Sequence, residues 1–251
     1  MKCKKHNLSY KYVCPECFQP YLKETAFSSL EEIREYQRLS SKRIKTTNLK
    51  NKINLIACLK IKYYNNVAYA GTIFYDIKNQ KAKNFEIRKY KQTIPYFPTL
   101  LFLRDLEIYL NLAEQIKFNP DCYLLNASGQ LHPFLFGVAC DFGLKLKEDI
   151  PVIGVTKKNL YKSGQLINLK ELNEFKIVGD IVFKNHLVGK YLSIINLEKG
   201  IYISVGNNIS LNLAIKIISN LLKYRIPEPI RLLNIELNKT IKNENTNSNG
   251  V

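Results

Sequence analysis

Residues 122–143, CYLLNASGQLHPFLFGVACDFG, combine an apolar run, a polar loop and a second apolar segment in direct succession. The run Cys122–Leu125 has the length and composition of a buried strand. The loop is rich in turn-forming residues, and the apolar residues after Pro133 recur at helical spacing. A strand that leads through a loop into a helix is typical of α/β proteins. The first loop residue, Asn126, carries a neutral amide and not a carboxylate.

Three strand candidates precede this unit. Residues 53–64, 67–77 and 84–92 are rich in strand-forming residues and are separated by short polar turns. Short connections between consecutive strands favour an antiparallel meander. After the proline-bounded PYFP, residues 99–116 place apolar residues at helical spacing, which predicts a helix.

Further strands and a helix follow the opening stretch. Short apolar runs predict strands at residues 151–155, 176–183, 191–197 and 201–206, and helical periodicity predicts a helix over residues 210–224. The polar segment 237–251 predicts a disordered tail. A meander followed by alternating helices and strands predicts the α/β class, with a mixed sheet flanked by helices.

The length and composition limit the class of protein. The chain has 251 residues, of which 46% are hydrophobic. At about 100–200 residues per domain, this length predicts one domain with at most a small additional module. No apolar run approaches the ~20 residues of a membrane span, and the charged segment Met1–Lys11 lacks the apolar centre of a signal peptide. We therefore expect a cytoplasmic protein that does not insert into a membrane.

The charge balance indicates a partner. Basic residues outnumber acidic ones by 38 to 21, a formal net charge of +17. Lys and Arg side chains release counterions from phosphate backbones, so this excess favours DNA or RNA. The alternative is that lysines in stretches such as KNQKAKNFEIRKYK, residues 78–91, only solvate an exposed face. Acidic proteins and anionic membrane surfaces are further alternatives.

The six cysteines fall into two groups. Cys58, Cys122 and Cys140 lie singly in apolar stretches, as reduced core residues do. The other three, together with a histidine, form a C-x2-H-x7-C-x2-C pattern that consists of Cys3, His6, Cys14 and Cys17. Two close pairs of soft ligands suit a tetrahedral Zn²⁺ ion, whose binding would fold a segment too short to have a core. The alternative is a chance cluster in a frayed terminus.

A helix is expected between this module and the main domain. Ser28 with Glu31, or Ser29 with Glu32, has the spacing of a capping box ahead of apolar residues one turn apart. The predicted organisation is a zinc-binding module at 1–22, a connecting helix at 23–50, the main domain at 51–236 and the tail at 237–251.

Four stretches occur in this order along the chain: PYFPTLLFLRD, GQLHPFLFGVACDFG, IPVIGVTKK and YRIPEPIRL. Together they resemble the endonuclease V family, and the resemblance extends over Ile53–Leu233. It implies an RNase H-like fold. It also implies a metal-dependent endonuclease that recognises a deaminated purine, hypoxanthine in DNA or inosine in RNA, and breaks a nearby phosphodiester bond.

The resemblance further implies three carboxylates that hold Mg²⁺, a hard cation that prefers oxygen ligands. In this chain the matching positions are Lys60, Asp105 and Asn126. Their formal charges sum to zero, whereas three acids would sum to −3, so the set has little hold on Mg²⁺. A rebuilt magnesium site would combine Asp105 with Asp141, which replaces a family histidine in the following helix.

We expect the Lys60 ammonium to occupy the metal position. A lysine with apolar neighbours in a strand is costly to bury unless it is paired. The expected partner is Asp105, and the side-chain oxygen of Asn126 is expected to accept a hydrogen bond. The alternative is that the strand turns Lys60 toward solvent.

The resemblance assigns nucleic-acid contacts to residues that this chain retains. Tyr96 in PYFP matches a tyrosine that acts as a wedge beside an unstacked base, and Phe97 stands next to it. Gly129 matches the tight loop of the base pocket, where Ala127 replaces another family glycine and narrows the pocket. Outside the family context, Tyr96 would be an ordinary core or surface tyrosine.

The remaining catalytic positions are partly retained. His132 matches the family's His-Pro pair, and Lys157 matches an active-site lysine that neutralises phosphate charge. Asn207 replaces the histidine of a later Gly-His-Arg motif. Outside the family context, a single histidine is more often structural and a lysine after a strand is usually solvated.

These observations lead to three hypotheses. The leading one is a catalytically degenerate endonuclease V relative that binds DNA or RNA, with the zinc module as a second contact. The second is an active, divergent endonuclease whose metal is held by Asp105 and Asp141. The third is a scaffold whose zinc module recruits a protein partner.

Overall fold

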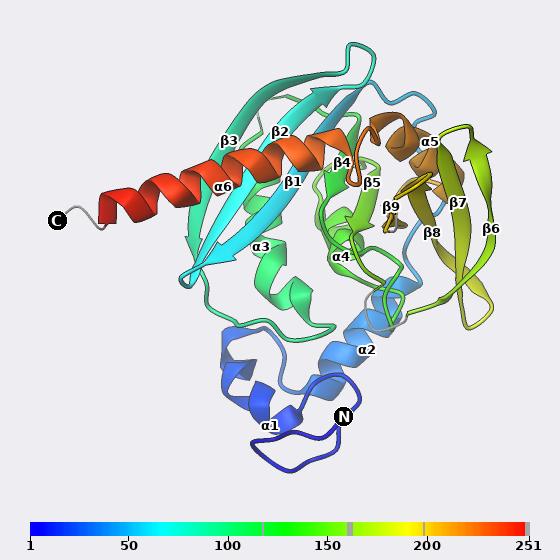
Figure 1. The fold of residues 1–251 in the computed structure, drawn as a ribbon. Coiled ribbons are helices and arrows are strands. Elements are labelled where there is room, and N and C mark those ends of the chain that lie inside the picture. Colours follow the sequence, from blue (N-terminus) through cyan, green and yellow to red (C-terminus); the bar gives the residue numbers. More distant parts are fainter. Residues whose placement is uncertain (117, 160–162, 198, 249–251) are drawn as a thin grey trace.

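The computed structural model describes residues 1–116, 118–159, 163–197 and 199–248. The described strands form one nine-stranded sheet in the order β3-β2-β1-β4-β5-β9-β8-β7-β6 (Figure 1). The strands are β1 Leu55–Tyr64, β2 Val67–Asp76, β3 Lys81–Lys91, β4 Cys122–Leu125, β5 Val152–Thr156, β6 Gln165–Asn173, β7 Lys176–Phe183, β8 His186–Ile194 and β9 Ile201–Asn207.

The sheet is mixed, as predicted. β1, β2 and β3 form the expected antiparallel meander. β1 pairs in parallel with β4, and β4 pairs in parallel with β5. From β5 onward, through β9, β8, β7 and β6, each strand is antiparallel to its neighbour. Because Leu59 pairs with Leu125, the carboxyl end of β4 lies beside the middle of β1, next to Lys60.

Helices cover both faces of the sheet. The face covered by α6 also carries α5, and Figure 1 shows α6 lying across β1, β2 and β3. The opposite face carries α3 and α4. The bounds of these helices are α3 Leu101–Glu114, α4 Val138–Lys145, α5 Leu211–Leu221 and α6 Glu228–Ser248.

Side-chain alternation along β1 divides the core in two. Ile56 and Cys58 belong to the apolar cluster of α5 and α6. Ala57 and Leu59 belong to the cluster of α3 and α4. Successive residues of a strand point to opposite faces, so this alternation fixes the direction of every later β1 side chain.

The N-terminal segment contains α1 (Pro15–Phe18), the 3₁₀ helix η1 (Gln19–Glu24) and α2 (Leu30–Ser41). The Ser29 hydroxyl accepts the backbone N–H of Glu32 at 3.1 Å, which confirms the second of the two predicted capping pairs. Helix α2 spans only part of the predicted connecting helix, since residues 42–54 lead to β1 without helical structure.

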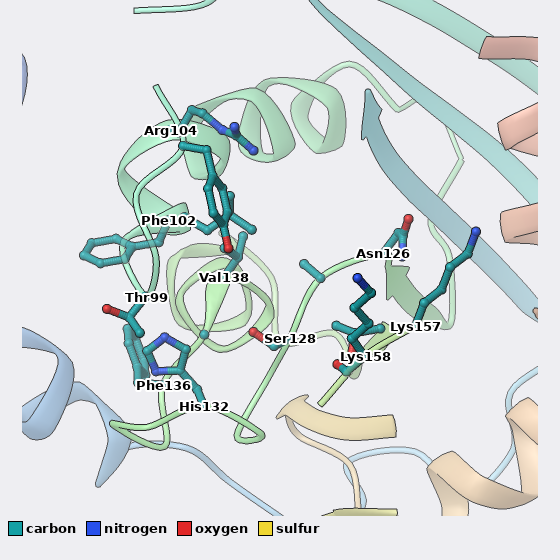
Figure 2. Close-up of a pocket in the computed structure, with 15 residues that line it drawn as sticks. Thr99, Phe102, Arg104, Asn126, Ser128, His132, Phe136, Val138, Lys157 and Lys158 are labelled. Atoms are coloured by element: carbon teal, nitrogen blue, oxygen red, sulfur yellow. Dashed lines mark hydrogen bonds between the residues drawn. The ribbon is translucent and has the colours of Figure 1, made fainter. Parts of the chain in front are cut away.

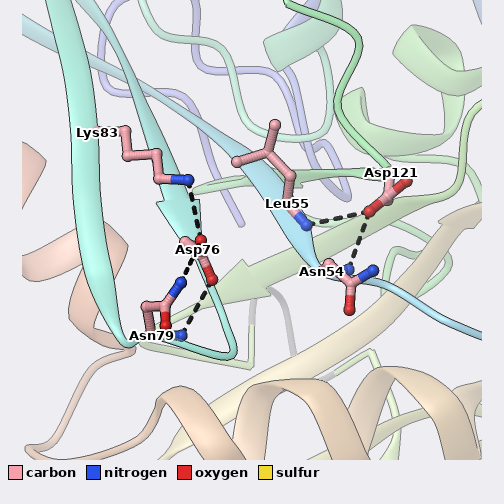
Figure 3. Close-up of polar contacts among 6 residues, drawn as sticks. All are labelled: Asn54, Leu55, Asp76, Asn79, Lys83 and Asp121. Carbon is pink, nitrogen blue, oxygen red and sulfur yellow. Dashed lines mark hydrogen bonds and ion pairs between the residues drawn. The ribbon is translucent and has the colours of Figure 1, made fainter.

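Two aspartates hold the ends of strands β1 and β2 (Figure 3). Asp121 accepts the backbone N–H groups of Asn54 and Leu55 at 2.9 and 3.0 Å. Asp76 accepts hydrogen bonds from Asn79 in the turn before β3 and from the Lys83 ammonium within β3. These contacts hold the pKa of Asp76 well below its ordinary value. Both carboxylates therefore have structural roles.

The predicted disorder of the tail is wrong over residues 237–248. Helix α6 continues through Ser248, and residues 249–251 lie outside the described part of the chain. Leu237 and Ile241 are buried and extend the apolar stripe of the helix. Glu244 accepts the Tyr69 hydroxyl at 2.7 Å. A narrow apolar stripe thus anchors a helix whose overall composition is polar.

Strand β6 was not expected. All of its residues are at least partly solvent-exposed, so burial imposes no apolar pattern that sequence periodicity would reveal. Within the described residues, no helix combines the length and apolar character needed to cross a membrane.

Candidate functional site

A cavity of 320 Å³ lies between the carboxyl ends of β4 and β5 and the amino end of α3 (Figure 2). Pockets that hold small molecules span ~300–1,000 Å³, so this cavity suits one small ring system. Its wall is mainly apolar, with charged groups at the edges. The lining residues are Tyr96, Thr99, Leu101, Phe102, Arg104, Asn126, Ala127, Ser128, His132, Phe136, Gly137, Val138, Thr156, Lys157 and Lys158.

Asn126 connects three strands beside the cavity. Its side-chain oxygen accepts a hydrogen bond from the Lys60 ammonium on β1, which confirms that prediction. Its side-chain N–H donates to the carbonyl of Val155 on β5 at 3.2 Å. Its backbone N–H donates to the carbonyl of Leu59 at 3.1 Å. Both functional groups of the amide are therefore engaged.

The predicted ion pair between Lys60 and Asp105 is wrong. The buried Asp105 carboxylate instead pairs with Arg104 Nε at 2.7 Å and accepts the Tyr63 hydroxyl at 2.6 Å. Strand alternation is the cause. Tyr63 lies on the face of β1 that packs against α3, whereas Lys60 lies on the opposite face with Lys62, whose ammonium reaches α6. Burial raises the pKa of Asp105, and the contacts with Arg104 and Tyr63 oppose that shift.

Lysines give this side of the cavity a positive charge. Lys157 and Lys158 follow β5, are exposed and line the cavity, as Figure 2 shows. Lys60 stands behind Asn126. Burial, together with the charges of Lys157 and Lys62, lowers the pKa of Lys60 to about 8. An anion bound here would favour the protonated form of Lys60, because an opposite charge raises the pKa of an amine.

The PYFP loop forms another part of the rim. Tyr96 lines the cavity with 52% of its surface exposed, and the Arg104 guanidinium lies 5.6 Å from its ring centroid. Phe97 does not line the cavity. It packs edge-on against Phe18 and Tyr21, with centroid distances of 5.1 and 5.4 Å. Only the first of the two rings is thus presented to a ligand, and the second is a packing residue.

His132 lines the cavity and is only 4% exposed. Burial and the positive charge of Arg34 lower its pKa to about 3. Its Nδ1 accepts the backbone N–H of Phe134 at 3.3 Å, so the proton of the neutral ring lies on Nε2. His132 is therefore a neutral polar group of the cavity wall near pH 7.

Gly129 is required by backbone packing. A Cβ atom at this position would lie 2.0 Å from the carbonyl oxygen of Val205 on β9. The Gly129 N–H donates to the Ser204 hydroxyl at 2.9 Å. Strand β9 thus fixes the loop whose neighbouring residues Ala127 and Ser128 line the cavity.

The predicted zinc ligands come together in the N-terminal segment. The ligand atoms of Cys3, His6, Cys14 and Cys17 all lie within 4.8 Å of one another. His6 Nδ1 lies 3.7, 3.7 and 3.4 Å from the sulfurs of Cys3, Cys14 and Cys17. Tetrahedral Zn²⁺ with bonds of ~2.0–2.3 Å separates its ligands by roughly 3.3–3.8 Å. The cluster therefore has the dimensions of a tetrahedral metal site.

Comparison with known proteins identifies the family. The family model for endonuclease V matches residues 37–234. The chain belongs to the endonuclease V family. Endonuclease V of Thermosipho melanesiensis is 31% identical over 208 residues, which are 80% of this chain and 87% of that protein.

Two solved endonuclease V structures share the fold. That of Bacillus subtilis has a TM-score of 0.77 at 22% identity and covers 88% of this chain and 96% of its own. That of Ciona intestinalis, in complex with a 24mer DNA containing an inosine followed by a ribo-adenosine, has a TM-score of 0.69 at 23% identity. It covers 85% of this chain and 98% of its own. The predicted RNase H-like fold is confirmed.

The residues at the positions that the resemblance assigns to Mg²⁺ do not fit this ion. Lys60 offers a cationic donor, Asn126 is already bonded to it, and the carboxylate of Asp105 is occupied by Arg104 and Tyr63. Among the residues that the structure describes, only the N-terminal cluster gathers three or more His, Cys, Asp or Glu ligands.

Asp141, the other candidate for a magnesium ligand, faces α2. Its fully buried carboxylate accepts the Tyr36 hydroxyl at 2.6 Å and lies 3.8 Å from the Lys145 ammonium. Burial raises the pKa of Asp141. It does not line the cavity, so the geometry gives no support to a magnesium site rebuilt from Asp105 and Asp141.

Asn207, at the position matched to the endonuclease V histidine, fastens the chain after α2. Its buried side chain accepts the backbone N–H of Lys45 at 3.0 Å. It also donates to the carbonyl of Gly143 at 3.1 Å. The asparagine thus has a structural role in this member of the family.

Two polar residues near the cavity were not among the predicted site residues. Arg104 lines it and holds Asp105, and its position beside that acid in LRD was the available signal. Gln37 of α2 is fully buried and donates to the carbonyls of Thr99 and Phe136 at 3.1 and 3.3 Å. Leu39, which helical spacing places one turn after Tyr36 on the predicted apolar face of this helix, is instead 53% exposed.

Proposed function

We propose that this protein binds DNA or RNA at a deaminated purine and does not break the phosphodiester bond with a magnesium ion. The observation that carries the proposal is the hydrogen bond between the Lys60 ammonium and Asn126. These residues stand at two of the positions that the family resemblance assigns to metal-binding carboxylates. An ammonium group there repels a divalent cation and attracts a phosphate. The site therefore favours binding without hydrolysis.

The cavity supports the binding of a single base. Its apolar wall includes Phe102, Phe136 and Val138, and Tyr96 stands at its rim. Stacking of one base on an aromatic ring contributes ~1–3 kcal/mol. The inosine-containing DNA bound by the Ciona intestinalis endonuclease V supports the choice of a deaminated purine.

The lysines support the binding of the flanking phosphate. Lys157 and Lys158 are exposed at the rim, and Lys60 lies behind Asn126. The net charge of +17 adds a general attraction for nucleic acid. We expect the phosphate to contact ammonium groups in place of a metal ion.

The test measures binding and cleavage separately. Inosine-containing and matched adenosine-containing strands, both DNA and RNA, are titrated with the protein in buffer depleted of divalent cations by resin. Soluble chelators are avoided, because they would also remove a metal from the N-terminal cluster. Tighter binding of inosine strands that stay intact when Mg²⁺ or Mn²⁺ is added supports the proposal. Equal affinity for inosine and adenosine strands would contradict the proposed recognition of a deaminated purine. Cleavage of the inosine strands would contradict the proposed loss of catalytic activity.

We also propose that the cluster of Cys3, His6, Cys14 and Cys17 binds Zn²⁺. The ligand types and their separations support this metal. One zinc ion per chain is expected by elemental analysis of protein purified without chelator. A Cys14→Ser variant is expected to lose most of it, and a wild type without zinc contradicts the assignment.

A further inference from the structure

Aromatic contacts link the N-terminal cluster to the cavity. Phe18 directly follows the ligand Cys17, and Tyr21 lies in the adjoining η1. Both rings pack on Phe97 at interplanar angles of 84° and 61°. Phe97 is the chain neighbour of Tyr96, the exposed ring at the cavity rim. A change in the cluster therefore reaches Tyr96 through one layer of side chains.

A second aromatic contact joins the N-terminal segment to the loop that contains His132 and Phe136. Tyr12, two residues before the ligand Cys14, packs edge-on against Phe134 at 5.9 Å. Phe134 lies between the cavity-lining residues His132 and Phe136. The N-terminal segment thus touches both loops that border the cavity.

Both loops contain a residue with strained backbone. Thr99 has φ of +65° and Leu135 has φ of +55°. The left-handed region is uncommon for residues other than glycine, above all for a β-branched threonine. Such a conformation persists only where the surroundings hold it. Gln37 holds one part of each loop, at the carbonyls of Thr99 and Phe136. Phe97 packs on Phe18 and Tyr21, whereas Phe134 packs on Tyr12 and also lies 4.5 Å from the Arg34 guanidinium of α2.

Residues 1–24, the part of the N-terminal segment that precedes α2, have little structure to hold these rings without a metal. Helix α1 has 4 residues and η1 has 6. The buried apolar residues of this part, Val13, Phe18 and Leu22, belong to the cluster of the main domain. In a segment this short, metal binding supplies the free energy of folding. The positions of Phe18 and Tyr21 therefore depend on two supports, the packing against the main-domain cluster and the metal ligands beside them.

We infer that a metal ion bound at the N-terminal cluster positions the Tyr96 loop and so sets the affinity of the cavity for a base. The nature of the ligand rests on the proposed function. Phe97 is the positioning residue through which the metal acts. The metal-free protein keeps Lys157, Lys158 and Lys60, so it retains salt-dependent binding to any strand. It loses the part of the affinity that depends on the base.

Hydrogen exchange on the full chain tests the link without a nucleic acid. The reporters are the backbone amides of Leu100, bonded to the Phe97 carbonyl at 3.1 Å, and Leu135, bonded to the His132 carbonyl at 2.8 Å. Removal of the metal with a chelator should speed exchange at both by about tenfold or more, with the Asn126 amide unchanged. The inference is overturned if both reporters keep their protection while the Phe18 amide of the module loses it.

Binding measurements with variants provide the second readout. Phe97→Ala cuts the link and leaves the metal ligands in place. With metal bound, this variant should bind inosine strands about 5- to 150-fold more weakly than the wild type, the range that corresponds to loss of one stacked base. Chelation should weaken the wild type by a similar factor and add little to the effect of Phe97→Ala. Gln19→Ala, at an exposed position beside Phe18, is the matched control and should bind as the wild type does.

The two readouts separate this inference from the proposed function. A wild type that shows no preference for inosine contradicts the proposed function, and the exchange reporters still decide whether the metal holds the loop. If chelation weakens the binding of inosine strands by Phe97→Ala protein as much as it weakens binding by the wild type, Phe97 is not the residue through which the metal acts. Unchanged binding by the metal-free wild type, together with protected reporters, would overturn the inference as a whole.

Discussion

Replacement of Lys60 with methionine should stabilise the protein. Burial lowers the pKa of Lys60 from 10.5 to about 8. At about 1.4 kcal/mol per pKa unit, the charged form costs about 3 kcal/mol at pH 7. Lys60→Met removes this cost and also loses a hydrogen bond to Asn126 worth about 1 kcal/mol. The net expectation is a gain of about 2 kcal/mol in the free energy of unfolding.

The lowered pKa of Lys60 determines how the stability difference between the two proteins changes with pH. Between pH 8 and 10.5 the unfolded chain keeps a proton on Lys60 that the folded chain has lost, so wild-type stability rises with pH in this window. The advantage of Lys60→Met should be constant below pH 8 and shrink as the pH rises to 10.5. Subtraction of the wild-type free energy of unfolding from that of the variant at each pH cancels the contributions of groups that titrate alike in both proteins.

Urea denaturation followed by circular dichroism measures both effects. Lys81→Met, at an exposed position of β3, is the control and should change the free energy of unfolding by less than about 0.5 kcal/mol. A destabilised variant, or an advantage that does not change between pH 8 and 10.5, would refute the reasoning.

Three further predictions concern the cavity. Tyr96→Ala should weaken binding of inosine strands by about 1–3 kcal/mol. Tyr224→Ala, at a similarly exposed tyrosine outside the cavity lining, is the control and should not weaken it. Equal losses of affinity in the two variants would contradict a stacking role for Tyr96. Because burial lowers the pKa of His132 from 6.5 to about 3, wild-type stability should fall as the pH drops through this window, by at most about 1.4 kcal/mol per unit. His132→Asn protein should lose this pH dependence. If the free energy of unfolding, measured by urea denaturation, changes with pH in the same way for both proteins, this contribution of His132 is excluded. Lys60→Asp combined with Asn126→Asp should bind Mg²⁺ measurably by calorimetry where the wild type does not, and a double variant without this gain would show that Arg104 and Tyr63 keep Asp105 unavailable.

The parts of the fold that bury an apolar face were predictable. The meander of β1 to β3 follows from apolar strand segments and short turns, and the caps of α2 follow from Ser29 and Glu32. Strand β6 has no buried residue that would reveal it. The end of α6 was missed because only Leu237 and Ile241 carry its buried stripe in a polar stretch. Sequence patterns thus report burial more directly than they report secondary structure.

The site was predictable where it depends on motifs and less so where it depends on side-chain direction. The contact between Lys60 and Asn126 follows from the convergence of β1 and β4. The partner of Asp105 depends on which face of β1 meets α3, and Tyr63 rather than Lys60 lies on that face. The packing role of Phe97 depends on how the N-terminal segment docks, which no pattern within that segment indicates.

Cleavage under single-turnover conditions tests the central claim most directly. Labelled inosine-containing DNA and RNA are incubated with excess zinc-loaded protein and Mg²⁺ or Mn²⁺, and bound and cut strands are counted separately. The account predicts strands that are bound in preference to adenosine controls and remain intact. Asp105→Asn protein, prepared in parallel, controls for contaminating nucleases. Cleavage near inosine that requires the divalent cation and disappears in Asp105→Asn would contradict the account.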